Sequence, residues 1–147
     1  MEGEGLASSY YKNMLLSNKD KLLRTSLYPG EDNFFKNNPN VAGMKTEDKK
    51  VILNPYSKLS PKELDAVYIN EATRINLDNY SDKPQFTLTD EQKEFFKDTA
   101  YGKNEAAAKD TVVARILSND PSVKTPTKEQ QDYVNKFLES QINAGRF

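Results

Sequence analysis

One segment carries residues whose types and spacing come close to a catalytic motif. Asn70-Glu71-Ala72-Thr73-Arg74 places a glutamate where zinc metalloproteases have the glutamate of His-Glu-x-x-His, and a strand-like segment and a loop precede it. Asn70 and Arg74 stand at the two positions where histidines would bind zinc. Arginine does not ligate zinc and the chain has no histidine, so a working protease of this type is excluded. A degenerate relative, or a cryptic hydrolase centred on Glu71, stays open as an alternative.

Other common catalytic side chains are missing as well. The 147 residues include no histidine and no cysteine, which excludes a serine–histidine triad, a thiolate nucleophile and metal sites built on imidazole or thiolate. Paired-carboxylate hydrolysis needs two acids in unlike environments, and Glu71 alone lies in an apolar segment. We therefore predict a non-enzymatic protein with no cofactor and no metal.

Two of the four arginines, Arg74 and Arg115, lie within apolar segments. A guanidinium near a core needs a partner, and its planar fork suits a carboxylate. Glu71 precedes Arg74 by one helical turn. We predict that Glu71, Arg74 and Arg115 form a partly buried ion-pair network between two helices, with a structural role.

The elements that position these residues are mostly helices. A helix is predicted over 6–27 with a break at Ser17-Asn18, and others over 61–79, 90–98, 104–118 and 128–143. Cap-and-return patterns begin three of them, at Ser60, Thr89 and Thr127. Asn119-Asp120-Pro121 and Gly145 are the predicted stops of the last two helices.

Shorter elements fill the region between the first two long helices. Asp32 is predicted to cap a helical turn containing Phe34 and Phe35, and residues 41–44 are predicted to form a loop. The best strand candidate is 50–55, with 85–88 as a second. The expected fold is mainly α, a compact single domain of about five helices over 31–147 with a minor two-stranded β element, preceded by an N-terminal helical arm over 1–30.

Aromatic doublets and the first helix suggest a surface for another protein. The doublets are Tyr10-Tyr11, Phe34-Phe35 and Phe95-Phe96. Neighbours on a helix point about 100° apart, so we expect one ring of each doublet to face the core and the other to lie at its rim. Apolar residues occur on more than one face of the first helix, which leaves open whether it packs on its own domain or on a neighbour. The predicted partner-binding residues are Tyr10, Tyr11, Leu15, Leu16, Phe34 and Phe35.

Charge and hydropathy restrict the partner and the compartment. The formal net charge is −1, without the basic excess typical of nucleic-acid binding, so no nucleic-acid partner is predicted. No apolar run approaches the roughly 18 residues of a membrane span. The acidic N-terminus lacks the layout of a signal peptide. We expect a protein of the cytoplasm or of the inside of an assembled particle, and oligomerisation stays open.

Four segments carry a resemblance to a family. They are Asn38-Pro39-Asn40-Val41-Ala42-Gly43-Met44, Val51-Ile52-Leu53-Asn54-Pro55-Tyr56-Ser57, Asn70-Glu71-Ala72-Thr73-Arg74 and Ala114-Arg115-Ile116-Leu117-Ser118-Asn119-Asp120-Pro121. Over roughly residues 31–137 the chain resembles small uncharacterised proteins of tailed bacteriophages, often from marine hosts. The resemblance implies a phage origin and no catalytic residues. The expected function is that of a virion-associated or accessory protein acting through protein contacts, with a small inhibitor or regulator of a host protein as the alternative.

Overall fold

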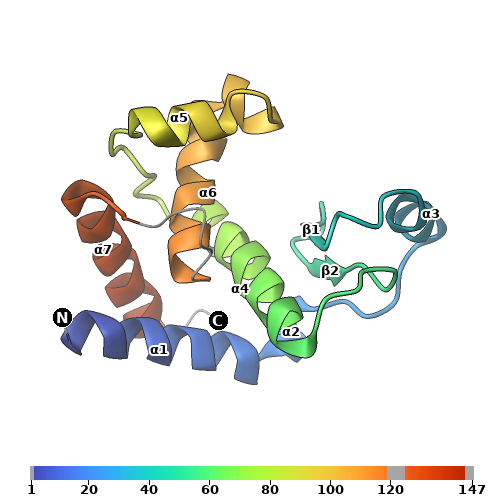
Figure 1. The fold of residues 1–147 in the computed structure, drawn as a ribbon. Coiled ribbons are helices and arrows are strands. Elements are labelled where there is room, and N and C mark those ends of the chain that lie inside the picture. The colour runs from blue at the N-terminus through green and yellow to red at the C-terminus, as the bar shows by residue number, and fades with distance from the viewer. Residues whose placement is uncertain (1, 119–124, 145–147) are drawn as a thin grey trace.

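Helices dominate the structure and one small sheet accompanies them, which confirms the predicted fold class (Figure 1). The computed structural model describes residues 2–118 and 125–144, with side chains from residue 7 onward. In chain order the helices in this part are α1 (Glu2–Ser17), α2 (Lys19–Leu22), α3 (Pro29–Asn37), α4 (Pro61–Asp78), α5 (Asp90–Phe96), the 3-10 helix η1 (Ala100–Lys103), α6 (Glu105–Leu117) and α7 (Lys128–Ala144). The stops predicted at Asn119-Asp120-Pro121 and Gly145 lie outside the described residues.

Helix α4 is the centre of the helical body, because α1, α6 and the sheet all pack against it (Figure 1). The Tyr11 hydroxyl of α1 lies 3.0 Å from Thr73 Oγ1 and accepts a hydrogen bond from the Asn76 amide at 3.2 Å. The Tyr11 ring meets Phe137 of α7 edge-on, with 6.0 Å between the ring centres. Tyr11 and Leu15 are fully buried, so α1 shares one core with α4 and α7. The boundary predicted at residue 30 therefore does not separate two cores.

Three helices begin with the reciprocal caps that their sequences predict. Ser60, Thr89 and Thr127 each accept a hydrogen bond from the backbone N–H three residues later, at 3.2, 3.0 and 3.1 Å. In return, the N–H of each cap residue donates to the side chain at that later position, namely Glu63, Gln92 and Gln130. The caps satisfy N–H groups that a helix leaves without partners at its first turn.

Two of these capping side chains also bond to each other in the core. Gln92 Nε2 donates to Gln130 Oε1 at 3.1 Å, and Gln130 Nε2 donates to Gln92 Oε1 at 2.8 Å. Gln130 Nε2 donates as well to the Thr87 carbonyl at 3.1 Å. Both amides are buried, and these bonds offset the cost of removing them from water. The amide pair joins the first turn of α5 to the first turn of α7.

The sheet is a hairpin of β1 (Gly43–Lys45) and β2 (Val51–Leu53), antiparallel, with Met44 opposite Ile52. Strand β2 confirms the strand predicted at 50–55. Its partner β1 falls where a loop was predicted, and the prediction of a strand at 85–88 is wrong. Residues 85–88 lie beside α7, where the Thr87 N–H donates to Glu129 and the Thr87 carbonyl accepts from Gln130. Side chains of α7 thus satisfy backbone groups that a neighbouring strand would otherwise pair.

The short helix around Phe35 begins earlier than predicted. Helix α3 starts at Pro29, and the Tyr28 N–H donates to Glu31 Oε1 at 2.9 Å. Asp32, predicted as the cap, lies within the first turn instead. Proline favours this start because its φ suits a helix and its missing N–H would have had no partner there. The break predicted at Ser17-Asn18 is confirmed, since α1 ends at Ser17 and α2 begins at Lys19.

Two searches of the described residues bear on broad classes of function. Within residues 2–118 and 125–144, no helix has both the length and the apolar character needed to cross a bilayer. The same residues contain no group of three or more aspartate or glutamate side chains placed to hold a metal ion.

Candidate functional site

A pocket of about 400 Å³ beside α4 collects the polar residues singled out in the sequence. One stripe of α4 lines it, and these residues share a helix face because they are spaced three and four apart. The stripe consists of Glu63, Ala66, Val67, Asn70, Glu71 and Arg74. The hairpin adds Ala42 and Gly43, and Tyr101, Arg115 and Ser118 come from η1, α6 and the end of α6.

Arg74 is held in the pocket by several hydrogen bonds. Its Nη2 donates to the Tyr101 hydroxyl at 2.7 Å and to Thr111 Oγ1 at 2.8 Å, and its Nε donates to Asn70 Oδ1 at 3.3 Å. Glu71 Oε2 lies 4.0 Å from the same Nε. The guanidinium is also 5.1 Å from the centre of the Tyr101 ring. Arg74 thereby ties α4 to η1 and α6.

Glu71 lies in surroundings that favour its neutral form. Burial raises the pKa of this carboxyl, and the positive charges of Arg74 and Lys45 offset only part of that effect. The other carboxylate of the pocket, Glu63, accepts a hydrogen bond from the Ser60 N–H at 3.1 Å and so belongs to the helix cap. Positions 63 and 71 are about 12 Å apart along the helix axis. That rise exceeds the separation of roughly 5–9.5 Å between the paired acids of glycosidases.

Arg115 enters the same pocket from α6. Its guanidinium lies 5.1 Å from the centre of the Phe95 ring and 5.5 Å from that of Phe96, which places the cation against aromatic faces of α5. The structure therefore brings Glu71 and Arg74 to 4.0 Å and places Arg115 in the lining of the same pocket.

Helix α3 lies at the margin of the molecule (Figure 1). Three of the exposed aromatic side chains belong to it or lie next to it. Tyr28 is 60 % exposed, Phe34 41 % and Tyr56 40 %. The Tyr56 hydroxyl donates to Asp32 Oδ1 at 2.9 Å, which keeps this ring beside α3. We call Tyr28, Phe34 and Tyr56 the α3 surface. Exposed large rings of this kind are typical of surfaces that bind other proteins.

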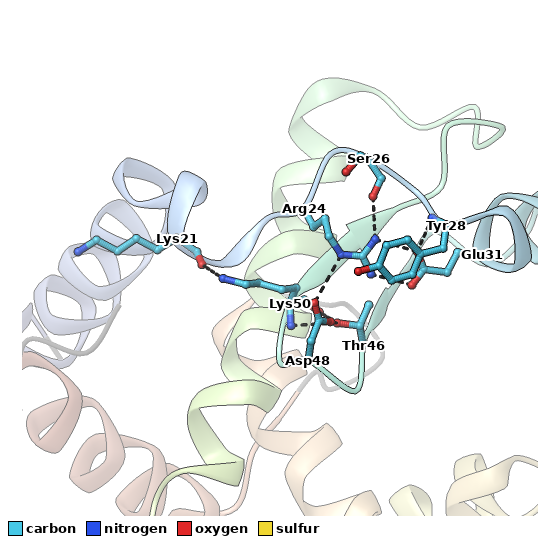
Figure 2. A network of polar contacts seen from close by, with 8 residues as sticks. All are labelled: Lys21, Arg24, Ser26, Tyr28, Glu31, Thr46, Asp48 and Lys50. Carbon is cyan, nitrogen blue, oxygen red and sulfur yellow. Dashed lines mark hydrogen bonds and ion pairs between the residues drawn. The ribbon is translucent and has the colours of Figure 1, made fainter.

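Arg24 attaches α3 to the hairpin (Figure 2). Its Nη1 and Nη2 donate to the two carboxylate oxygens of Glu31 at 2.8 and 2.7 Å, and Nη1 also donates to the Ser26 carbonyl at 2.7 Å. Asp48, in the turn of the hairpin, lies 3.7 Å from Nε. The guanidinium stacks 4.2 Å from the centre of the Tyr28 ring. The bond from Arg24 holds the pKa of Glu31 below its usual value.

Only part of the predicted partner-binding set is accessible. Tyr10 is 51 % exposed and Phe34 41 %, while Leu16 is partly buried against the core. The fully buried members are Tyr11, Leu15 and Phe35. These three side chains pack inside the chain, because helical neighbours point in different directions, and they are not accessible to a partner.

Sequence reasoning missed Arg24, Tyr101 and Gly43. Arg24 and Glu31 lie on opposite sides of a Pro-Gly turn, so no helical spacing pairs them; the scarcity of arginine in this lysine-rich chain was the available signal. A Cβ on Gly43 would lie 2.8 Å from Val67 Cγ1 and 3.1 Å from the Ile52 carbonyl oxygen. This close approach of β1 to α4 depends on the tertiary fold and leaves no local pattern.

Comparisons of the chain with family models, with curated proteins and with solved structures found no match. The function is therefore argued from the geometry of this chain. The two features that bear on it are the α3 surface and the pocket beside α4.

Proposed function

We propose that this chain is a non-enzymatic protein of a tailed bacteriophage that acts by binding another protein, as a virion-associated or accessory component. The observation that carries the proposal is the α3 surface, where Phe34 of α3, the preceding Tyr28 and the neighbouring Tyr56 are exposed. Helix α3 lies at the margin of the fold (Figure 1). Interfaces are enriched in aromatic residues. The resemblance to phage proteins supplies the setting, which is the virion or the host cytoplasm.

The attachment of α3 supports a binding role. Bonds from Arg24 to Glu31 and from Tyr56 to Asp32 hold the helix and one of the rings in place before any partner arrives. Side chains that are already ordered lose less conformational entropy on binding. The balanced charge, −1 overall, favours a protein partner over a nucleic acid.

The first test locates the chain and its binding surface. A tagged chain produced during infection is followed by mass spectrometry of purified particles, with the double variant Tyr28→Ser/Phe34→Ser compared to Tyr10→Ser. Tyr10 is a matched control because it is also about half exposed but lies on α1. We expect incorporation to fall at least tenfold in the α3 double variant and to persist in the control. Loss in the Tyr10 variant alone would move the interface to α1 and contradict the proposal.

The same experiment separates the alternative of a host-directed inhibitor or regulator. That protein would be absent from purified particles and would co-purify with one host protein, and the complex would again depend on the α3 surface.

The pocket favours a second candidate function, a hydrolase centred on Glu71. Glu71 lines the pocket, and burial raises the pKa of its carboxyl, as general acids require. Its test is a screen of ester, glycoside and peptide substrates with the wild-type chain and Glu71→Gln. Turnover that disappears in Glu71→Gln at unchanged melting temperature would establish this function and overturn the non-enzymatic proposal.

A further inference from the structure

A second pocket, of about 340 Å³, lies where α5, η1 and the first turn of α6 meet. We call it the α5 pocket. The buried side chains of its lining are apolar, namely Leu88, Phe96 and Ala108. The Tyr101 ring also lines it and meets the Phe96 ring edge-on, with 5.7 Å between the ring centres. The volume is near the lower end of the roughly 300–1,000 Å³ of small-molecule sites, so the pocket suits a small ligand.

Contacts between η1 and the end of α5 hold one side of the pocket in place. The Thr99 N–H and the Thr99 hydroxyl both donate to the Phe96 carbonyl, at 2.9 and 2.7 Å. A Cβ on Gly102 would lie 2.5 Å from the Lys97 carbonyl oxygen, so this close approach requires glycine. The pocket is therefore formed before a ligand arrives, and little conformational entropy is lost in shaping it.

Lysines outnumber acids in the lining of the α5 pocket. Its charged members are Lys93, Lys97 and Glu105. Lys97 pairs with Glu94 at 2.5 Å. Glu105 pairs with Lys109 at 3.6 Å. The Lys93 ammonium has no hydrogen bond or ion pair to any residue that the structure describes, and it is the cation left over.

The spacing of the two lining lysines adds to this excess. Lys93 and Lys97 are four residues apart, and like charges at this spacing on a helix destabilise each other. An anion beside both ammonium groups would relieve the repulsion. The pocket thus combines a buried apolar lining with a rim that favours negative charge.

We propose that the α5 pocket binds a free amphiphilic carboxylate of medium chain length. The apolar chain lies against Leu88, Phe96 and Ala108, where its removal from water supplies most of the affinity. The carboxylate lies beside Lys93 and Lys97, which supply the preference for an anion over a neutral or cationic head group. This site is separate from the α3 surface and does not depend on the proposed role in protein binding.

The probes are hexanoate, octanoate and decanoate, titrated into the wild-type chain at pH 7 below their micellar concentrations. Nuclear magnetic resonance signals of the Leu88 and Ala108 methyl groups should shift and saturate as for one site. Each two-carbon extension that enters the pocket should tighten binding at least fourfold, because additional apolar surface is buried. Octylammonium and octanol have the same chain length as octanoate and should bind at least fivefold more weakly.

Lysine variants test the charge. Lys93 is exposed and unpaired among the described residues, so its substitution leaves the fold intact. We expect Lys93→Gln to weaken octanoate binding at least threefold and to change octanol binding less than twofold. Lys93→Arg should retain octanoate binding. Lys128→Gln, at an exposed lysine of α7, is the matched control and should bind octanoate as the wild type does.

A fourth variant tests the location of the apolar chain. Ala108→Leu places a larger side chain in the pocket and should weaken binding of octanoate and octanol at least tenfold. Circular dichroism shows whether this variant folds. The methyl shifts in the wild-type chain locate the ligand independently of it.

Three results would overturn the inference. The first is the absence of shifts at Leu88 and Ala108 with every alkanoate. The second is an affinity for octylammonium equal to that for octanoate, and the third is unchanged octanoate binding in Lys93→Gln. Tyr28→Ser/Phe34→Ser should bind octanoate as the wild type does. A failure of the α5 pocket is thus distinguished from a failure of the α3 surface.

Discussion

At the scale of single residues, Glu71 and Arg74 are neighbours with different contributions to stability. Arg74 donates to Asn70, Tyr101 and Thr111 and connects three elements. Glu71 gains less from its surroundings, because burial raises its pKa despite the nearby guanidinium. The folded state therefore favours the protonated carboxyl, which a glutamine imitates.

We predict opposite effects for substitutions at these two positions. Arg74→Gln should lower the free energy of unfolding by about 3 kcal/mol, since it removes the donor shared by the buried Thr111 and the partly buried Asn70 and Tyr101. Glu71→Gln should leave stability unchanged or raise it at pH 7. Its difference from wild type should shrink as the pH falls through the raised folded-state pKa of Glu71 and be gone below 4.5, the ordinary pKa of the side chain. Urea denaturation at several pH values measures both. Equal losses of stability in the two variants would contradict the conclusion that Arg74 stabilises the fold and the charged form of Glu71 does not.

The glycines offer a second matched pair. A Cβ at Gly43 would meet Val67 and the Ile52 carbonyl, whereas a Cβ at Gly30, in the first turn of α3, would meet nothing within 4 Å. Gly43→Ala should cost about 1–3 kcal/mol through overpacking between β1 and α4. Gly30→Ala should be neutral or stabilise by up to about 1 kcal/mol. Thermal unfolding followed by circular dichroism checks both, and a stable Gly43→Ala would show that β1 can shift away from α4.

At the scale of elements, local signals were enough for helices and not for strand pairing. Ser60, Thr89 and Thr127 each cap a helix through side chains three residues away, and this spacing is visible in the sequence. Phe86 and Leu88 alternate with polar residues as in a strand, and both are buried, but α7 side chains bond to the intervening Thr87 backbone. The alternation of apolar residues at 85–88 thus coincides with buried side chains but not with a strand.

The same distinction applies to the pocket. Glu71 and Arg74 share a face because they are one turn apart, which the sequence predicts. The apolar surroundings of Arg115 suggested that it belongs with this pair, but its place in the same pocket lining, and that of Tyr101, depend on how α4 and α6 pack. The edge of β1 was equally hidden, because Gly43-Met44-Lys45 has no strand pattern of its own.

At the scale of elements we predict the effect of removing the Ser60 cap at the start of α4. Ser60→Ala should lower the free energy of unfolding by about 1 kcal/mol, because it removes the bond to the Glu63 N–H at the start of α4. Ser9→Ala, on an exposed face in the middle of α1, is the control and should be neutral or slightly stabilising, since alanine has the higher helix propensity. Equal losses at the two positions, measured by urea denaturation, would argue against the cap.

At the scale of the whole molecule, α3 is attached to the rest of the chain by the ion pair of Arg24 and Glu31, which acid should weaken. The pKa of Glu31 is held below its ordinary value of 4.5 by the bond from Arg24. A lowered folded-state pKa contributes stability that is fully present above 4.5 and is lost as the pH falls through the folded-state value. Binding that depends on the α3 surface should be lost in the same range.

We predict that α3 loosens before the helical body when the pH is lowered. Nuclear magnetic resonance signals of α3 amides should shift below pH 4.5 while those of α4 remain unchanged. In Glu31→Gln the α3 signals should lack this pH dependence, because the titrating group is gone. Simultaneous changes in α3 and α4, or an unchanged response in Glu31→Gln, would place the acid-sensitive contact elsewhere.

The amide pair of Gln92 and Gln130 has a consequence for how the chain finds its register. Each glutamine accepts the return hydrogen bond of the cap at the start of its own helix, and its amide also bonds to the amide of the other glutamine. The two residues are 38 positions apart in the sequence. If α7 began one residue earlier or later, the whole helix would rotate by about 100°. That rotation would break both sets of bonds and turn Phe137 away from Tyr11. The hydrogen bonds between the two glutamines therefore fix the rotation of α7 about its axis, and with it the side of the helix that faces the core.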